Sequence, residues 1–504
     1  MYNIMEERAS GVLCHISSLY SEFGIGDLGK SAYDFVDFLV LAKQSIWQIL
    51  PVNPTSFGDS PYQSFSTFAG NPLFICPQTL LEWDLLAPKD LLHDINFPEN
   101  KIDYAEVISL KERIFRKAYA NFKNSPFARA FKIFVEENAD WLVDYSRFLA
   151  LKSHFIAARK HLPLPKGEVA DYYYGAVWST WPEVLPEADA DEVGYHNFLQ
   201  FIFYKQYAAL KAYANKKGIK IAGDIPIFAA YDSADCWANR KLFKLDAKGR
   251  PIAVAGVPPD YFAKDGQLWG NPLYDWRAHK AEGYKWWIAR ISKALEVFDI
   301  LRLDHFRGFE SYWTVPYGAK TAKLGAWQPG PGREFFGALK GALGELPIVA
   351  EDLGIITPAV AKLLKELNLP GMKVLQFAFD NTKNNTHMPH NFDTNNIVVY
   401  TGTHDNDTTL GWYATAPEKS RDQFRRYLNV SGENAPHDLI RAALLSIAKI
   451  AIIPVQDLLS LDSVHRTNTP GEAAGNWQFR LKKGQIRESH AENLAYLTEL
   501  SCRA

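Results

Sequence analysis

The chain has 504 residues, with 55 lysines and arginines against 57 aspartates and glutamates and no long run of one sign. This balance predicts no nucleic-acid partner and no attachment to a membrane surface. No stretch approaches the roughly 18 apolar residues of a membrane span, and the N-terminus lacks the pattern of a signal peptide. Scattered cysteines without a compact framework are typical of reduced thiols, so we expect a cytoplasmic protein. The cysteines are Cys14, Cys76, Cys236 and Cys502.

Strand-like and helix-like patterns alternate along most of the chain. The first helical pattern places Phe35, Phe38, Leu39 and Ala42 on one face. Seven strand-like runs follow: SIWQILPV, KIAGDIPIF, DILRLDHF, PIVAED, MKVLQFAF, NIVVYTG and AIIPVQDLL. Alternation of this kind predicts parallel strands joined by helices, and seven strands is close to the eight of a (β/α)8 TIM barrel. A doubly wound open sheet is the alternative, disfavoured because no glycine-rich phosphate turn opens a helix.

Two stretches depart from this alternation. From about residue 77 to about residue 195, helical stretches rich in lysine, glutamate and alanine alternate with proline-containing connections. From about residue 229 to about residue 276 the periodicity is sparse, which predicts a long loop. No flexible linker brackets the first stretch. We therefore expect one barrel domain over residues 1–504, with a helix-rich insertion and a loop insertion.

Four acidic residues each end one of the strand-like runs. They are Asp224, Asp304, Glu351 and Asp405. Carboxylates at the C-terminal ends of barrel strands point into the mouth of the barrel, where such folds keep their chemistry. Paired carboxylates are the usual means of cleaving a glycosidic bond. The pattern therefore predicts a carbohydrate-active enzyme.

Asp304 and Glu351 are the best candidates for a catalytic pair. Asp304 follows Arg302, which would keep its carboxylate ionised as a nucleophile requires; a structural salt bridge would give the same pattern. Glu351 follows an apolar strand, and burial there would raise its pKa and let it hold a proton for the leaving oxygen. Its neighbour Asp352 competes for this role, because only one of two adjacent side chains faces the mouth.

The other two acids have weaker signals. Asp405 lies in GTHDNDTT beside His404, where an imidazole and a carboxylate could bind the vicinal hydroxyls of a sugar. A metal site is the alternative, disfavoured because the spacing is not that of a helical zinc motif. Asp224 could equally fix a loop through an Asx turn. Nearby loops carry Tyr and Trp rings of the kind that stack on sugars, although an isolated ring is more often a core contact.

Eight motif groups follow one another from about Ser10 to about Arg480: SPYQSFSTFAGNP, GDIPIF with DSADCWAN, AGVPPDYFAKDGQLWGNPLYDW, LRLDHFRGF, VAEDLGIIT, LPGMKVLQFAF, YTGTHDNDTTLGWY and NTPGEAAGNWQFR. Together they closely resemble the 4-α-glucanotransferases, also called amylomaltases or disproportionating enzymes, of glycoside hydrolase family 77. The long third motif is the specific one, because the shorter ones recur across the wider α-amylase clan. The resemblance implies a (β/α)8 barrel with insertions and without the separate C-terminal β-domain of α-amylases.

The resemblance also implies a role for each matching position. Asp304 would be the nucleophile, Glu351 the general acid/base and Asp405 the stabiliser of the transition state. The substrate-binding positions would be Ser60, Tyr62, Asp224, Tyr261, Phe262, Trp269, Arg302, His404, Asn468 and Pro470. Among these, Tyr261, Phe262 and Trp269 would line the acceptor side, on the substrate-binding loop insertion at about 229–276. The implied partners are α-1,4-glucans and maltooligosaccharides, with no metal and no cofactor.

Two positions depart from the family pattern. Tyr20 stands where a proline is usual, and VHRTN around Arg466 replaces a small-Arg-Met-Asn pattern; neither change touches the three catalytic carboxylates. The expected reaction is retaining transfer through a covalent glucosyl-enzyme, with the two main carboxyl groups about 5–5.5 Å apart. A hydrolase of the α-amylase type and a glucan-binding scaffold are the alternatives, the scaffold being disfavoured by the three intact carboxylates.

Overall fold

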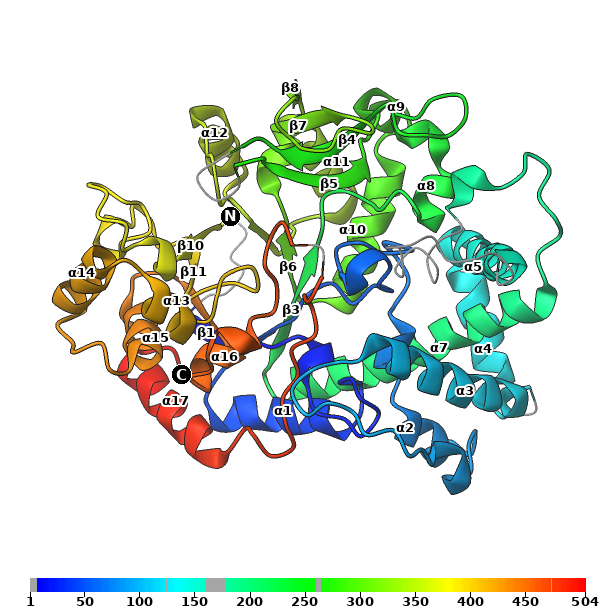
Figure 1. The fold of residues 1–504 in the computed structure, drawn as a ribbon, viewed down its shortest axis with the longest axis horizontal. Coiled ribbons are helices and arrows are strands. Elements are labelled where there is room, and N and C mark those ends of the chain that lie inside the picture. The colour runs from blue at the N-terminus through cyan, green and yellow to red at the C-terminus, as the bar shows by residue number, and fades with distance from the viewer. Residues whose placement is uncertain (1–6, 124, 160–176, 260–263, 473) are drawn as a thin grey trace.

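The computed structural model describes residues 7–123, 125–159, 177–259, 264–472 and 474–504. Its centre is a sheet of eight parallel strands (Figure 1). The strands are β1 Ala9–Leu13, β2 Ile46–Gln48, β3 Lys220–Ile225, β6 Ile300–Leu303, β9 Ile348–Ala350, β10 Gly371–Val374, β11 Ile397–Tyr400 and β12 Ile450–Pro454. They lie in the order β10-β11-β12-β1-β2-β3-β6-β9.

The sheet closes into a barrel between the two ends of this order. The amide of Ala350, at the end of β9, donates a hydrogen bond of 2.9 Å to the carbonyl of Pro370, directly before β10. Alternate side chains of the strands fill the interior, among them Ile46, Ala222, Ile300, Val349, Met372, Val398 and Ile452. The prediction of a TIM-like barrel with insertions is confirmed.

The eighth strand is β1, which the strand-like patterns did not reveal. Its sequence, ASGVL, is rich in small residues that have weak strand preference. Its neighbours supply what its own propensity does not, because β1 pairs with both β2 and β12. A Cβ atom at Gly11 would lie 2.3 Å from the carbonyl oxygen of Ile46, so only glycine allows the observed approach to β2.

Helices surround the barrel and fill the long connections. Among the described residues they are α1 Lys30–Leu41, α2 Pro77–Glu82, α3 Tyr104–Phe122, α4 Ala128–Glu137, α5 Ala139–Arg159, α7 Ala190–Lys216, α8 Ala234–Ala238, α9 Trp276–Ala281, α10 Lys285–Val297, α11 Gly332–Leu343, α12 Pro358–Leu367, α13 Thr409–Thr415, α14 Glu418–Leu428, α15 Ala435–Leu445, α16 Val455–Leu458 and α17 Glu488–Leu500. In Figure 1, α3, α4, α5 and α7 lie together on one side of the barrel and α13 to α17 on the other.

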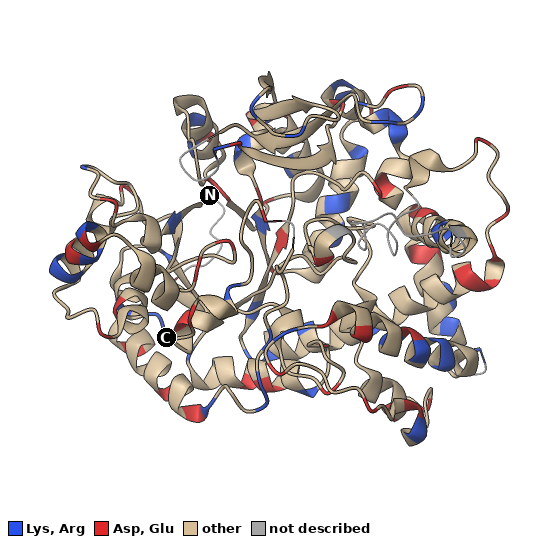
Figure 2. Cartoon of the chain, viewed as in Figure 1, with Lys and Arg blue, Asp and Glu red and all other residues tan. Residues whose placement is uncertain are grey.

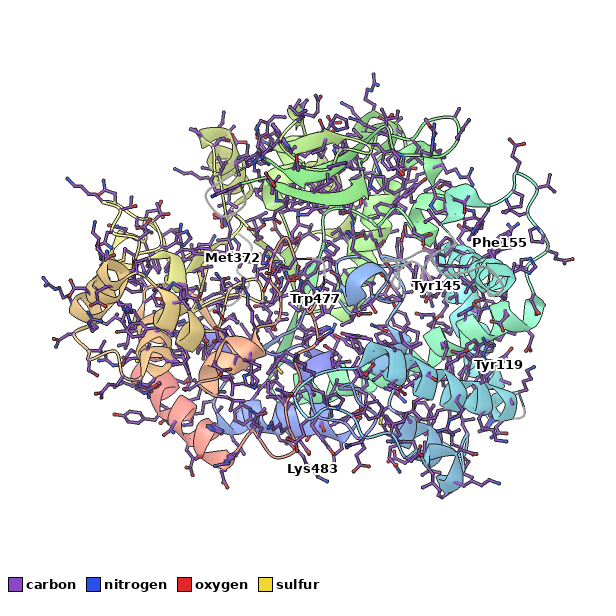
Figure 3. The ribbon with its side chains drawn as sticks, in the orientation of Figure 1. Tyr119, Tyr145, Phe155, Met372, Trp477 and Lys483 are labelled. Carbon is purple, nitrogen blue, oxygen red and sulfur yellow. The ribbon has the colours of Figure 1, made fainter. Side chains whose placement is uncertain are left out.

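The connection between β2 and β3 contains α2 to α7 and covers the stretch in which the sequence shows helical patterns. Figure 3 shows Tyr119 on α3 and both Tyr145 and Phe155 on α5 in this region. Tyr145 is fully buried, and rings from α3, α5 and α7 belong to the same apolar core as the helices around the barrel. The helices of this connection therefore share one apolar core with the helices around the barrel.

A second sheet stands above the barrel in Figure 1. It is antiparallel, with β4 Ala253–Val257, β5 Gln267–Pro272, β7 Ser311–Pro316 and β8 Ala326–Pro329 in the order β5-β4-β7-β8. The sequence predicts a long loop over residues 229–276, whereas the structure has β4 and β5 there. Both strands are short and contain glycine. β4 is stabilised by pairing with β7, which lies about 60 residues away along the chain, and β5 pairs with β4.

The remaining features concern the surface and the C-terminal part. No strand follows β12 among the described residues, and α17 is the last regular element. Basic and acidic residues are interspersed along the ribbon in Figure 2. Within the described ranges, no helix combines the length and the apolar character that crossing a bilayer requires. The four cysteines are free thiols, and only Cys502 is exposed.

Candidate active site

The four acids found in the sequence lie at one end of the barrel. Asp224 is the penultimate residue of β3, and Asp304 and Glu351 directly follow β6 and β9. Asp405 lies in the connection between β11 and α13. Because all eight barrel strands are parallel, these side chains meet at the same C-terminal mouth.

Arg302 joins two of these acids. Its Nη1 atom lies 2.5 Å from Asp224 Oδ2 and 2.9 Å from Asp304 Oδ1. The Tyr62 hydroxyl donates a further hydrogen bond of 2.8 Å to Asp224 Oδ2. Asp224 is fully buried, whereas 27% of the Asp304 side chain is exposed. The arginine therefore fixes one carboxylate inside the protein and presents the other to the mouth.

Glu351 has surroundings that favour its protonated form. Two amide hydrogen bonds, of 2.8 Å from His305 to its Oε2 atom and of 2.7 Å from Leu353 to its Oε1 atom, favour the ionised form, but burial and charge outweigh them. Burial raises the pKa of Glu351 well above its usual range, and the nearby negative charge of Asp304 raises it further. A glutamate in this setting can carry a proton at neutral pH and donate it to a leaving group.

The neighbouring Asp352 points elsewhere. Its Oδ1 atom accepts a hydrogen bond of 2.6 Å from the amide of Met372, in β10. Burial raises the pKa of Asp352 as well, but Asp304 is not among the charges that act on it. Of these two neighbours, Glu351 is the one whose pKa the charge of Asp304 raises, which favours Glu351 over Asp352 as the acid.

Asp405 is the most open of the four acids, with 44% of its side chain exposed. Its Oδ1 atom accepts a hydrogen bond of 2.6 Å from Asn468 and lies 3.3 Å from His404 Nε2. Arg466 donates to the Asp405 carbonyl oxygen at 2.6 Å. In the described part of the chain, no group of three or more His, Cys, Asp or Glu side chains is suited to hold a metal ion.

Aromatic rings line the mouth beside Asp405. The rings of Tyr62 and His404 are stacked, with centroids 5.2 Å apart, and Trp477 packs against both at 5.6 Å and 5.9 Å. Figure 3 shows Trp477 near the centre of the molecule. Ser60 supports this wall, because its Oγ atom accepts a hydrogen bond of 3.2 Å from the amide of Tyr62.

The second sheet contributes a ring on the side of Asp304. Trp269, in β5, packs edge-on against His305 with ring centroids 4.8 Å apart. Gln63 holds the Trp269 backbone through a hydrogen bond of 3.3 Å to its carbonyl oxygen. Tyr261 and Phe262, which the sequence assigns to the same side, lie outside the described residues.

Comparison with known proteins identifies the family. The family model described as 4-alpha-glucanotransferase matches residues 14–486. The chain belongs to this family, glycoside hydrolase family 77. It is an enzyme with 4-alpha-glucanotransferase activity. This activity favours the transferase interpretation over both a hydrolase and a non-catalytic scaffold.

Individual relatives match over nearly the whole chain. The chain is 46% identical to a 4-alpha-glucanotransferase of Synechocystis sp., covering 99% of this chain and 98% of the relative. It is 45% identical to one of Thermus thermophilus, with 98% and 99% covered. Among solved structures, an amylomaltase from Streptococcus agalactiae in complex with acarbose superposes with a TM-score of 0.90 at 38% identity, covering 99% of this chain and 100% of that one.

The structure brings most of the predicted site residues together. Contacts link Ser60, Tyr62, Asp224, Arg302, Asp304, His404, Asp405 and Asn468 at the mouth. Glu351 accepts a hydrogen bond from the amide of His305, and the His305 ring packs against Trp269. Pro470 lies exposed, two residues beyond Asn468, and no polar contact ties it to the acids. Trp477 was not singled out from the sequence, although the tryptophan of the GNWQFR motif was visible there.

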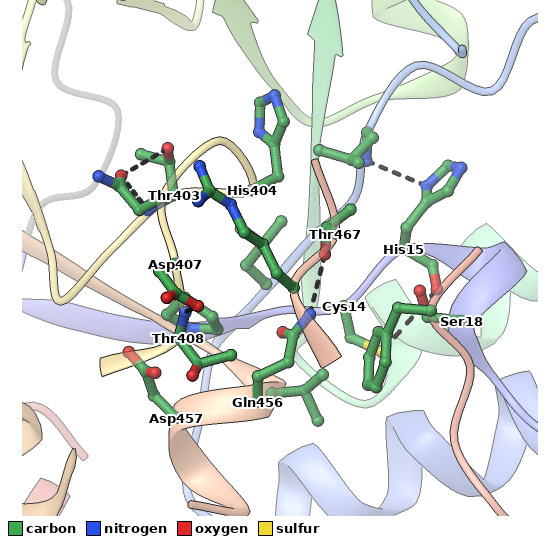
Figure 4. A pocket seen from close by; sticks show the side chains of 17 residues that line it. Cys14, His15, Ser18, Thr403, His404, Asp407, Thr408, Gln456, Asp457 and Thr467 are labelled. Atoms are coloured by element: carbon green, nitrogen blue, oxygen red, sulfur yellow. Dashed lines mark hydrogen bonds between the residues drawn. The ribbon is translucent and has the colours of Figure 1, made fainter. Parts of the chain in front are cut away.

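A small cavity adjoins the site beneath His404 (Figure 4). It lies between the ends of β1, β11 and β12, and its polar lining includes His15, Gln456, Asp457 and Thr467. Gln456 donates a hydrogen bond of 2.8 Å to Thr467 Oγ1. None of these residues was predicted to belong to the site, because each lies in an otherwise apolar or loop-like run without a recognisable spacing.

Proposed function

We propose that the enzyme transfers α-1,4-glucan segments from a donor chain to the 4-hydroxyl of an acceptor glucan or glucose, through a covalent glucosyl-enzyme. The observation that carries this proposal is the contrast between two neighbouring carboxyl groups. Asp304 is paired with Arg302 at 2.9 Å, whereas burial and the charge of Asp304 raise the pKa of Glu351. One group suits a nucleophile and the other suits an acid.

Asp304 is the nucleophile in this mechanism. Arg302 holds its Oδ1 atom, and the partly exposed carboxylate attacks the anomeric carbon of the donor. The new bond joins C1 to the carboxylate oxygen while the bond between C1 and the glycosidic oxygen breaks. Glu351 gives its proton to that oxygen, and the shortened donor leaves with a free 4-hydroxyl.

The second step reverses the roles. Glu351, now deprotonated, removes the proton from the 4-hydroxyl of the acceptor, whose oxygen attacks C1 and displaces Asp304. Two inversions at C1 retain the α-configuration. We expect the two carboxyl groups to lie about 5–5.5 Å apart in a crystal structure of a glucan complex. A separation of about 6.5–9.5 Å, which leaves room for a water between them, would contradict the mechanism.

Asp405 stabilises the positive charge that develops on the donor sugar. Its position beside His404 and its exposed carboxylate support this role. Tyr62, His404 and Trp477 offer ring faces to the same sugar, and the buried Asp224 Oδ1 atom has no partner in the described structure and can accept a sugar hydroxyl. Arg302, Ser60, Asn468 and Pro470 complete the binding positions that we assign.

The acceptor side accounts for transfer rather than hydrolysis. Transfer requires that a sugar, not water, occupies the position facing the glucosyl-enzyme. Trp269 lies against His305, next to the nucleophile, and supports stacking of an acceptor ring there. We assign Tyr261 and Phe262 to the same acceptor surface. We expect maltooligosaccharides to occupy this mouth. We also expect acarbose to bind there, because the amylomaltase from Streptococcus agalactiae forms a complex with it.

Incubation with maltotriose tests the proposed function. We expect glucose together with a ladder of glucans longer than maltotriose, and we expect the ladder to disappear in Asp304→Ala while the circular dichroism spectrum is unchanged. The matched control is Asp352→Asn, which leaves both catalytic carboxyl groups in place. A product mixture that contains only shorter sugars would favour the hydrolase alternative, and a ladder from Asp304→Ala would assign the nucleophile to another residue.

A further inference from the structure

Hydrogen bonds to one buried carboxylate hold both ends of the loop that carries His404 and Asp405. Thr401 directly follows β11, and Thr409 begins α13, so residues 402–408 form the loop between them. The Thr401 hydroxyl donates to Asp457 Oδ2 at 2.5 Å, and the Thr409 hydroxyl donates to the same atom at 2.6 Å. The Thr409 amide donates to Asp457 Oδ1 at 2.7 Å.

Asp457 comes from the neighbouring strand connection. It lies in α16, directly after β12, and only 2% of its surface is exposed. Both threonines are fully buried as well. Figure 4 shows Asp457 below Asp407 and Thr408, at the edge of the cavity beneath His404. One side chain of the β12 connection thus fixes the entry and the exit of the β11 connection.

Holding a loop through a buried carboxylate has a cost in folding free energy. In the described part of the chain, no lysine or arginine nitrogen lies within 4.0 Å of Asp457, and the carboxylate depends on hydrogen bonds alone. Burial of a carboxylate without a cation costs free energy that three hydrogen bonds offset only in part. A network that satisfies all its members can nevertheless hold a unique local structure.

Gln376 holds the same loop from the connection that follows β10, the strand on the other side of β11. It follows β10, and its Nε2 atom donates to the Asp407 carbonyl oxygen at 2.9 Å and to Thr409 Oγ1 at 3.3 Å. Thr409 therefore accepts from Gln376 and donates to Asp457, so one hydroxyl joins the connections of three adjacent strands. The cluster is satisfied throughout and leaves Asp405 itself free to face the mouth.

We propose that Asp457 is a positioning residue for glucan transfer, which acts through the loop 402–408 on His404 and Asp405 and makes no contact with the glucan. The inference rests on the role proposed above for Asp405. Asp457, buried behind the site, thereby holds the carboxylate of Asp405 where positive charge develops in the transition state. A displacement of about 1 Å at such a position can lower a rate about 100-fold.

Kinetics of Asp457→Ala and Asp457→Asn test this role. In Asp457→Ala we expect kcat for maltotriose disproportionation to fall about 10- to 100-fold while KM changes much less, because positioning matters most in the transition state. Asp457→Asn keeps the shape and one acceptor, and its kcat should lie between those of the parent and Asp457→Ala. Amide hydrogen exchange in the peptide containing residues 402–408 should become faster in Asp457→Ala.

Asp299→Ala is the matched control. Asp299 also ties strands together, accepting hydrogen bonds of 2.8 Å from the Ile221 amide and from Asn215 Nδ2, but it lies before β6 at the opposite end of the barrel. We expect it to lower the melting temperature without changing kcat or exchange in residues 402–408. An equal loss of kcat in both variants would overturn the proposal, as would an unchanged kcat in Asp457→Ala.

Two further variants, Thr409→Val and Asp405→Ala, complete the test of the positioning role. If Asp457→Ala does not fold, Thr409→Val removes a single hydroxyl of the same cluster and should lower kcat several-fold without a matching rise in KM; an unchanged kcat would overturn the proposal. Asp405→Ala, measured alongside, separates the two proposals. Loss of activity in Asp405→Ala with a normal Asp457→Ala would contradict only the positioning role, whereas full activity in Asp405→Ala would contradict the role of Asp405 itself.

Discussion

On the β3–β6 side of the mouth, Asp304 is paired with a buried arginine that belongs to a strand, whereas on the β11–β12 side Asp405 stands on a loop held by hydrogen bonds. The first arrangement concerns charge: the cation of Arg302 pairs with two carboxylates, next to a glutamate whose pKa is raised. The second arrangement fixes the position of the Asp405 carboxylate. The nucleophile and the stabiliser therefore depend on different physical devices, and variants on the two sides should fail in different ways.

Among the variants that test this comparison, Arg302→Met should have the largest effect on stability and activity. It removes the ion-pair partner of Asp304 and leaves the fully buried Asp224 without its cation. Loss of one partner from a buried ion pair costs about 3–5 kcal/mol of folding free energy. We expect a lower midpoint of urea unfolding together with a kcat reduced by about 100-fold. Parent-like stability would show that Asp224 does not depend on Arg302.

Asn468→Ala should have a smaller effect, confined to the loop side. It removes the hydrogen bond of 2.6 Å to Asp405 Oδ1, which is open to solvent on its other side. A hydrogen bond to a charged group is worth about 1.5–3 kcal/mol, so kcat should fall about tenfold or somewhat more. Thermal unfolding should be nearly unchanged. A loss of stability as large as that of Arg302→Met would contradict the division between the two sides.

The shift in the pH profile should be the smallest of these effects, but it should occur only in the variant on the Asp304 side. Activity requires protonated Glu351, so kcat/KM should fall as the pH rises through the raised pKa of Glu351. Arg302 opposes that shift, because its positive charge lowers the pKa of Glu351. Removing the charge in Arg302→Met should therefore move the alkaline limb to higher pH, while Asn468→Ala leaves it in place. A limb that moves to lower pH in Arg302→Met would assign it to another group.

Much of the barrel and its acids could be predicted from the sequence, because buried parallel strands are written as apolar runs and their C-terminal residues share one edge. Glu351 and Asp352 could not be separated, since the choice depends on the backbone contact between Asp352 and Met372. The strand β1 was hidden by its small residues. The strand β4 was hidden because its partner β7 is distant in the sequence, and β5 because it depends on β4.

The supporting residues of the site were less visible than the acids themselves. Asp457 lies in the run AIIPVQDLL, where it reads as an ordinary polar residue at the end of a strand. Its importance depends on Thr401 and Thr409, which lie 56 and 48 positions away along the chain. Contacts of this range carry no local pattern, so only the fold brings them together.

Trapping of the glucosyl-enzyme tests the proposed mechanism most directly. The enzyme is incubated with a fluorinated α-glucosyl fluoride, which forms the covalent intermediate faster than the intermediate is released, then digested and analysed by mass spectrometry. The mechanism predicts one added glycosyl group on the peptide LDHFR, at Asp304, and none in Asp304→Ala. A label on any other residue, or rapid turnover of maltotriose by an enzyme that never forms the adduct, would contradict it.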